Sequence, residues 1–109
     1  MRAEQIQEIL SLYIKHGWTL RRVLLTSKQK NQIANSIEML FKSAEIIDAE
    51  IDAVWLSRVS TENRESWEIR RLSETGYALN EVFEEDDEEE VREEIRQEMQ
   101  ARMQEQVKN

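Results

Sequence analysis

The sequence predicts an α+β fold: a four-stranded, mostly antiparallel sheet with helices on one face, in the order α-β-α-β-β-β-α. Three observations lead to this class. Apolar residues recur every three to four positions in two segments of the first half, as they do on amphipathic helices. Apolar and polar residues alternate in four other segments, as they do on strands. The last three strand-like segments are separated only by short polar turns, which is typical of an antiparallel meander.

The N-terminal half is expected to hold two helices and one strand. We expect a helix from Ala3 to His16, because its apolar residues lie on one side and Gly17 follows where a left-handed residue would end it. Residues 18–25 alternate and predict a strand. Thr26 is placed to cap a second helix at about residues 28–43, whose apolar residues have helical spacing.

The rest of the body is expected to form the meander. Residues 50–59, 67–73 and 77–83 each alternate apolar and polar side chains, so they predict three strands. Polar residues 60–66 form the first turn. In the second turn, Gly76 is expected to supply a positive φ.

An acidic segment separates this body from a C-terminal helix. Residues 84–90 are consecutive acids. Such a run is either a disordered or docking segment or, as we favour, the start of a helix. At a helix start, Asp86 or Asp87 would be the cap and the other carboxylates would face the positive end of the helix dipole. We therefore expect a single domain over residues 1–87 and an acidic helix over residues 88–109 that packs on the body or on a partner.

The apolar residues of that helix predict self-association. Val91, Ile95, Met99 and Met103 recur every four positions. Because an α-helix has about 3.6 residues per turn, this stripe is narrow, winds around the helix and buries little surface on its own. Flanking charges of both signs would let an antiparallel copy align with complementary pairs. The alternative is that the same stripe packs on the parent domain.

Two of the expected strands carry a repeated tryptophan–arginine pattern, W-x-[LI]-R-R-[VL]. Alternation puts Trp18 and Arg22 on one face of the first strand, and Trp67 and Arg71 on one face of the third. If the two faces coincide, these four residues form a site for an anionic ligand, because guanidinium groups bind carboxylate or phosphate and indoles offer stacking surfaces. The alternative, which we favour, is that the tryptophans are core and the arginines pair with carboxylates across strands.

Composition narrows the classes of function. The chain has no cysteine, so it has no thiolate metal site, and a reducing, cytoplasmic setting is expected. Residues 84–109, with 4 basic and 11 acidic residues, account for −7 of the net charge of −8, so nucleic acid is not an expected partner. The first residues lack a secretory signal and no apolar run could span a membrane. With one histidine, His16, and no catalytic or metal-binding motif, neither an enzyme nor a cofactor or metal is expected.

These observations predict a non-enzymatic interaction module that self-associates through the sheet face or the terminal helix. Its expected partner is a second copy or another protein, not a membrane. The alternative is a small domain that binds an anionic ligand or nucleic acid through the tryptophan–arginine surface. An enzyme that uses unidentified carboxylates is the least favoured of the three hypotheses.

Overall fold

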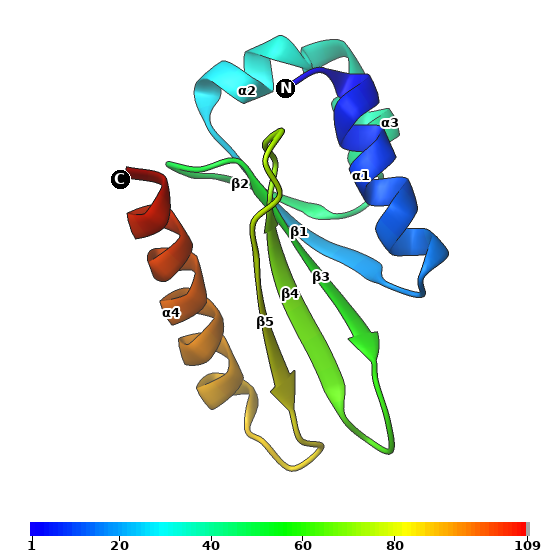
Figure 1. Cartoon of the computed structure of the whole chain (residues 1–109), viewed down its shortest axis with the longest axis vertical. Helices are drawn as coiled ribbons and strands as arrows, with labels where there is room; N and C mark the ends of the chain where they lie inside the picture. The colour runs from blue at the N-terminus through cyan, green and yellow to red at the C-terminus, as the bar shows by residue number, and fades with distance from the viewer. Residues whose placement is uncertain (109) are drawn as a thin grey trace.

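The computed structural model describes residues 1–108, which form one five-stranded sheet with helices on both sides (Figure 1). In chain order the elements are α1 (Ala3–Lys15), β1 (Thr19–Leu25), α2 (Ser27–Gln32), the 3-10 turn η1 (Ala34–Ser36), α3 (Ile37–Phe41), β2 (Glu45–Asp48), β3 (Ala53–Val59), β4 (Glu65–Arg71), β5 (Ala78–Phe83) and α4 (Glu89–Lys108). The strand order across the sheet is β2-β1-β3-β4-β5. β1 and β2 are parallel, and all other neighbouring strands are antiparallel.

The predicted class is confirmed, but the sheet has one more strand than expected. The fold is α+β and the sheet is mostly antiparallel, with β2 as a fifth strand beside β1. Sequence analysis missed β2 because it has only 4 residues, two isoleucines between acidic ends, which is too short for alternation to show. The two isoleucines lie on opposite faces of the sheet, because Ile46 packs against one hydrophobic cluster and Ile47 against another.

The expectation that helices cover only one face of the sheet is wrong. α1, α2 and α3 lie on one side of the sheet and α4 lies on the other (Figure 1). The reason lies in the central strands. β1 ends in three consecutive buried residues, Val23 to Leu25, and β3 begins with a longer buried run, Ala53 to Ser57. Because successive side chains of a strand point to opposite faces, both faces of the sheet centre are apolar and both need cover.

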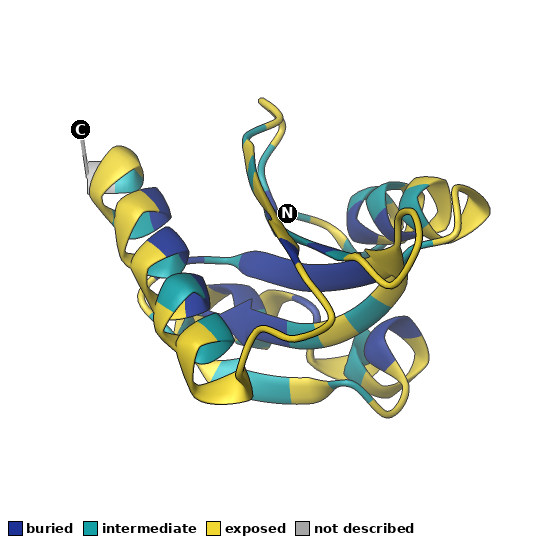
Figure 2. Cartoon of the chain, turned by 90° about the horizontal axis from the view of Figure 1, so that it is seen from below, coloured by how far each residue is buried: buried dark blue, intermediate teal, exposed yellow. Residues whose placement is uncertain are grey.

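Two hydrophobic cores result, one on each face. The α1-side core contains the buried residues Ile6, Leu10, Val23, Leu25, Ile33, Leu40, Phe41, Val54, Leu56 and Leu72. The α4-side core contains Leu24, Ile51, Ala53, Trp55, Ile69, Met99 and Met103. Figure 2 shows the buried residues along the central strands and on the side of α4 that faces the sheet. The sheet is thus the middle of three layers.

The second predicted helix is broken into short pieces. It begins as expected at Thr26, whose hydroxyl oxygen accepts a hydrogen bond from the backbone N–H of Gln29 at 3.2 Å. Ile33 then leaves helical geometry, and η1 and α3 follow as separate turns. Lys42 ends α3 with a φ of 49° and redirects the chain towards β2. The break lets both Ile33 and Phe41 reach the α1-side core.

The acidic run leads into a helix, as favoured from the sequence, but α4 begins at Glu89, so the prediction that Asp86 or Asp87 caps it is wrong. The carboxylate of Asp87 instead accepts a hydrogen bond from the backbone N–H of Glu84 at 2.8 Å, within the preceding turn. Arg92 donates to the backbone carbonyl oxygens of Glu84 and Asp87, at 2.6 and 3.1 Å. α4 packs on the body; whether residues 1–87 fold without it stays a prediction.

The two glycines have different roles. Gly17 has a φ of 87° and ends α1 in the left-handed conformation that was predicted for it. Gly76 does not have a positive φ, so the role predicted for it is wrong. The connection between β4 and β5 spans residues 72–77, longer than a two-residue hairpin turn, and so it does not require a left-handed residue at this position.

Candidate interaction surface

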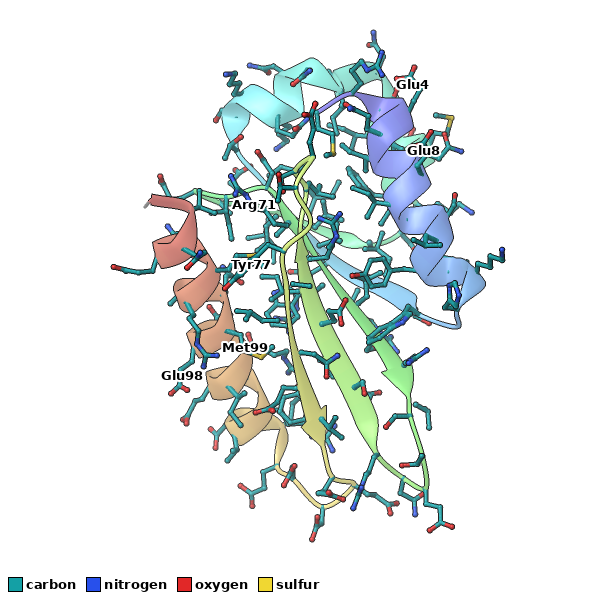
Figure 3. All side chains as sticks on the ribbon, in the orientation of Figure 1. Glu4, Glu8, Arg71, Tyr77, Glu98 and Met99 are labelled. Carbon is teal, nitrogen blue, oxygen red and sulfur yellow. The ribbon has the colours of Figure 1, made fainter. Side chains whose placement is uncertain are left out.

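The apolar stripe of α4 is used mainly within the chain. Met103 is fully buried and Met99 is 4% exposed in the α4-side core. Met99 points towards the sheet, whereas its neighbour Glu98 points away (Figure 3). Ile95 packs against the same core and Val91 is 46% exposed. Three of the four residues expected to mediate self-association therefore cover the chain's own sheet, and self-association through this helix stays a prediction.

Charged side chains hold the first half of α4 on the sheet. Arg22 donates two hydrogen bonds to the Glu93 carboxylate, at 2.8 and 3.2 Å. Arg96 is 1% exposed and donates to the same carboxylate at 2.9 Å and to Glu89. The Arg96 guanidinium also lies over the Trp67 ring, 4.3 Å from its centroid, in a cation–π contact. The buried charge of Arg96 is thus compensated by two partly exposed carboxylates, although its Nη1 is buried without a hydrogen-bond partner among the described residues.

The pKa of Glu93 reflects its place in this cluster. Burial raises the pKa of this carboxyl, but hydrogen bonds from Arg22, Gln97 and Arg96 lower it more, to about 2. The carboxylate therefore stays ionised at neutral pH and is a poor candidate for a general acid or base there. An external anion would have to displace the Glu93 carboxylate from its bonds with Arg22 and Arg96.

The four residues of the tryptophan–arginine pattern do not meet. A β-bulge between Leu20 and Arg22 reverses the alternation of side chains in β1. Trp18 therefore packs on the α1-side core, whereas Arg22 lies 5.9 Å from the Trp67 ring on the α4 side. Arg71 shares the face of Trp67 but lies at the other end of β4. The expected convergence is wrong, Arg22 pairs with a helix rather than a neighbouring strand, and anion binding by these residues stays a prediction.

Neither a metal cluster nor a membrane segment marks a site in the part of the chain that the structure describes. No group of three or more His, Cys, Asp or Glu side chains is placed there to hold a metal ion. None of the described helices is long and apolar enough to cross a membrane. His16 caps the C-terminal end of α1, with its Nδ1 2.8 Å from the backbone oxygen of Leu12. It is thus a helix-end residue, as predicted.

One part of the sheet is uncovered on the α1 side. The α1-side core contains residues of β1 and β3 but none of β5. The opposite face of β5 is covered, because Leu79 packs against the α4-side core and Phe83 is buried. The residues of β5 that point to the α1 side are all exposed: Ala78, Asn80 and Val82. We refer to these three as the edge residues and to the sheet surface around them as the open face.

Hydrogen bonds link the open face to α1. The Tyr13 hydroxyl donates to the Glu68 carboxylate on β4, and the Asn80 amide donates to the other oxygen of that carboxylate at 3.2 Å. Burial, and then the bond to Glu68, raises the pKa of Tyr13 well above 10, so the phenol remains a donor. Trp18 packs edge-on against Tyr13, with ring centroids 5.8 Å apart, and Arg58 lies 4.6 Å above the Trp18 ring. These contacts fix α1 at the border of the open face.

Hydrogen-bond pairing shows which main-chain groups β5 presents at its outer edge. The backbone N–H of Arg71 donates to the C=O of Tyr77 at 2.9 Å, so these two residues form a hydrogen-bonded pair. In an antiparallel ladder such pairs alternate with pairs that do not exchange bonds. In the observed register, the residues of β5 that bond to β4 are Leu79, Glu81 and Phe83. The three edge residues between them therefore point their N–H and C=O groups away from β4.

The pairing on the other side of β4 agrees with this assignment. The backbone N–H of Leu72 donates to the C=O of Asp52 at 2.8 Å, so even-numbered residues of β4 bond to β3 and odd-numbered ones to β5. Among residues 1–108, no strand lies beyond β5. The edge residues thus offer main-chain donors and acceptors to a partner strand.

The opposite edge of the sheet is better protected. β2 has 4 residues with an acid at each end, Glu45 and Asp48, and Asp48 accepts a hydrogen bond from Lys30 at 3.1 Å. β5 has 6 residues, no proline and no lysine, and its only charge, Glu81, points to the α4 side. Short length and charged side chains are the usual protection of edge strands, so β5 is the more accessible edge.

Sequence analysis did not identify the β5 edge as a site. Alternation does show that Leu79 and Phe83 share a face with Glu81. The order of strands across a sheet depends on long-range pairing, however, and no local pattern shows that β5 is the last strand. The scarcity of charge in residues 78–83 is the one signal that points to this strand.

Comparison with known proteins does not assign this chain to a family. No family model, no curated protein and no solved structure matches the chain. The function is therefore argued from the surface itself.

Proposed function

We propose that this chain is a non-enzymatic interaction module that binds a protein partner by taking up one of the partner's strands at the edge of β5. The observation that carries the proposal is the row of outward-pointing main-chain groups on Ala78, Asn80 and Val82, beside a sheet face that no helix covers. Strand addition at a free sheet edge is a recurring mode of recognition. Main-chain hydrogen bonds supply the affinity and alternate side chains supply the specificity.

The size of the edge limits the affinity. Each of the three edge residues carries one N–H and one C=O, so a fully paired partner strand makes up to about six hydrogen bonds. Each bond contributes little net free energy, because both groups give up a bond to water to form it, and association itself costs translational and rotational freedom. Contacts with the exposed side chains of Ala78 and Val82 add to the bonds. We therefore expect weak binding, no tighter than the micromolar range.

The surroundings of the edge favour a protein over a polyanion. The net charge of −8 opposes association with a phosphate backbone. The open face combines apolar side chains, Ala78 and Val82, with the polar groups of Asn80 and Glu68. Such a mixture is typical of surfaces that associate with other proteins.

A strand peptide tests the proposal directly. The probe is a synthetic peptide with the sequence of residues 77–84, added at about 1 mM to detect micromolar or weaker binding. Amide hydrogen exchange, followed by mass spectrometry with fragmentation at about 1 µM protein so that copies of the chain do not pair, should slow at Ala78, Asn80 and Val82, because their N–H groups become hydrogen-bonded. The amides of Leu79 and Glu81 already bond to β4 and should change little.

A pair of variants at Asn80 controls the experiment. Asn80→Pro removes the central outward N–H and should abolish the protection, while proline remains acceptable on an edge strand. Asn80→Thr changes the side chain but keeps the N–H, so it should retain the protection. A peptide that protects a different part of the chain, or none at about 1 mM, would contradict strand addition at β5.

A further inference from the structure

We infer that the strand taken up by β5 is β5 of a second copy of this chain, so that two sheets join into one across a two-fold axis at Asn80. The inference rests on the proposed function and names its partner. A two-fold dimer, in which one surface meets its own copy, is the commonest symmetric assembly of small proteins. A two-fold axis perpendicular to a sheet places two copies of an edge strand side by side in antiparallel orientation. The outward N–H and C=O groups of β5 can form hydrogen bonds in that orientation.

Two conditions set the register of the pair. Residues that face each other across an antiparallel pair lie on the same face of the sheet, so the two-fold axis must pass through a residue and not between two. The largest overlap of the strand Ala78–Phe83 then places the axis at Asn80 or at Glu81. At Glu81 two carboxylates would face each other, which is unfavourable. At Asn80 two neutral amides face each other, so charge selects Asn80.

With the axis at Asn80, every outward main-chain group of β5 finds a partner. Ala78 faces Val82 of the second copy, and Asn80 faces Asn80 of the second copy. The side chains of these pairs meet on the open face, which α1 borders through the bond from Tyr13 to Glu68 while its core lies over β1 and β3. Asn80 donates one amide hydrogen to Glu68 at 3.2 Å, and its side-chain oxygen can accept from the amide of the second copy.

α4 does not block the approach of a second copy. The Trp55 indole on β3 donates to Gln100 at 3.3 Å, and Arg22 on β1 donates to Glu93. The helix therefore crosses the α4-side face of the sheet, with side-chain contacts as far as β1 and its closest backbone approach to β4 and β5. A helix whose axis lies over β4 would be three strand spacings, roughly 14 Å, from its copy in the joined sheet. That is more than the 8–10 Å or so between packed helices.

Charge complementarity is a second observation in favour of self-pairing. Arg71 lies beside Tyr77 at the start of β5 (Figure 3), and none of the ion pairs found among the described residues involves its guanidinium. In the inferred register Tyr77 faces Phe83 of the second copy, directly before the acidic residues 84–90 of that copy. This arginine, which forms no ion pair in the described part of its own chain, thus lies near the most acidic segment of the second copy.

Light scattering on charge variants at Asn80 tests the inference. At tens of micromolar, an order of magnitude suited to micromolar affinity, the native chain should be a dimer. Asn80→Lys and Asn80→Asp each place like charges on the axis, so each alone should bind at least about tenfold more weakly and be monomeric. An equimolar mixture brings opposite charges together and should restore a dimer of one copy of each. Asn80→Thr should stay dimeric, and circular dichroism should show that every variant is folded.

Each other result has a defined meaning. A native chain that is monomeric at about 100 µM overturns self-pairing; if the β5 peptide still protects the edge amides, the proposed function stands with another protein as partner. Dimers that persist in both charged variants place the contact elsewhere and overturn the inference. Monomeric variants whose mixture stays monomeric overturn the register at Asn80. Arg71→Glu should weaken the native dimer at low salt, and an unchanged dimer would refute the contact with residues 84–90.

Discussion

Replacing Met103 with alanine tests the docking of α4 on the sheet. Met103 is fully buried in the α4-side core, in the same cluster as Trp55 and Ile69. Met103→Ala removes every side-chain atom beyond Cβ from this interface. Because the bonds from Arg22 and Arg96 to Glu93 hold the helix in place, the backbone cannot simply close the gap, and a cavity remains.

The expected loss is a large part of the total stability. Truncation of a buried methionine to alanine costs about 2–5 kcal/mol, and complete burial puts the expectation for Met103→Ala near 3 kcal/mol. A domain of this size unfolds with a free energy of about 5–15 kcal/mol. At about 4–5 °C for each kcal/mol, Tm should fall by roughly 10–15 °C. Val91→Ala is the matched control on the same helix, because Val91 is 46% exposed and should cost less than about 1 kcal/mol.

Urea unfolding followed by tryptophan fluorescence measures both variants. Trp55 is fully buried and lies under α4, so its emission reports on the interface. A protein concentration of about 1 µM keeps self-association from adding to the apparent stability. Equal and small losses for Met103→Ala and Val91→Ala would refute the docked helix and revive the view that α4 serves a partner.

Three further predictions follow from the ion pairs and from the buried phenol. The folded-state pKa of Glu93, about 2, lies below its ordinary value of 4.5. Its ionised carboxylate therefore adds to the free energy of unfolding above about pH 4.5, and this contribution is lost as pH falls towards 2. Glu93→Gln should accordingly flatten the acid side of a curve of stability against pH. Arg22→Gln should cost about 1–2 kcal/mol in urea unfolding after allowance for partial exposure, whereas Arg71→Gln should stay within about 0.5 kcal/mol; equal effects would contradict the assigned pairing. Because the pKa of Tyr13 is raised, one tyrosine should ionise only above pH 10 or so in an ultraviolet titration. The stability of the protein should fall as pH rises through that ionisation. Tyr13→Phe should remove this late step from the titration.

Local chemistry along the chain determined the elements and several of their ends. The apolar stripe from Ile6 onwards, with Gly17 behind it, specifies α1, because one side of a helix must be buried and a left-handed residue can end it. The hydroxyl of Thr26 specifies the start of α2. The acidic run specifies the start of α4 near Glu89, because carboxylates are stabilised at a helix N-terminus. Each of these signals acts within a few residues of sequence and is therefore readable from sequence alone.

The candidate site was only partly readable in this way. Arg22 and Trp67 do lie near each other, as the less favoured hypothesis of an anion site required, but one bulge beside Arg21 sends Trp18 to the other face. The carboxylate that Arg22 binds comes from Glu93, 71 residues away in sequence. No local spacing encodes such a contact, because it exists only after α4 has packed on the sheet.

Tertiary structure decided the rest. β2 is a strand because it pairs in parallel with β1, and its four residues do not predict this pairing by themselves. The side of the sheet that each helix covers follows from burying both apolar faces of β1 and β3. The position of β5 at the edge follows from the order in which the strands pair. Strand order is set by contacts between residues distant in sequence, so the free edge at Asn80 becomes visible only when the whole sheet is assembled.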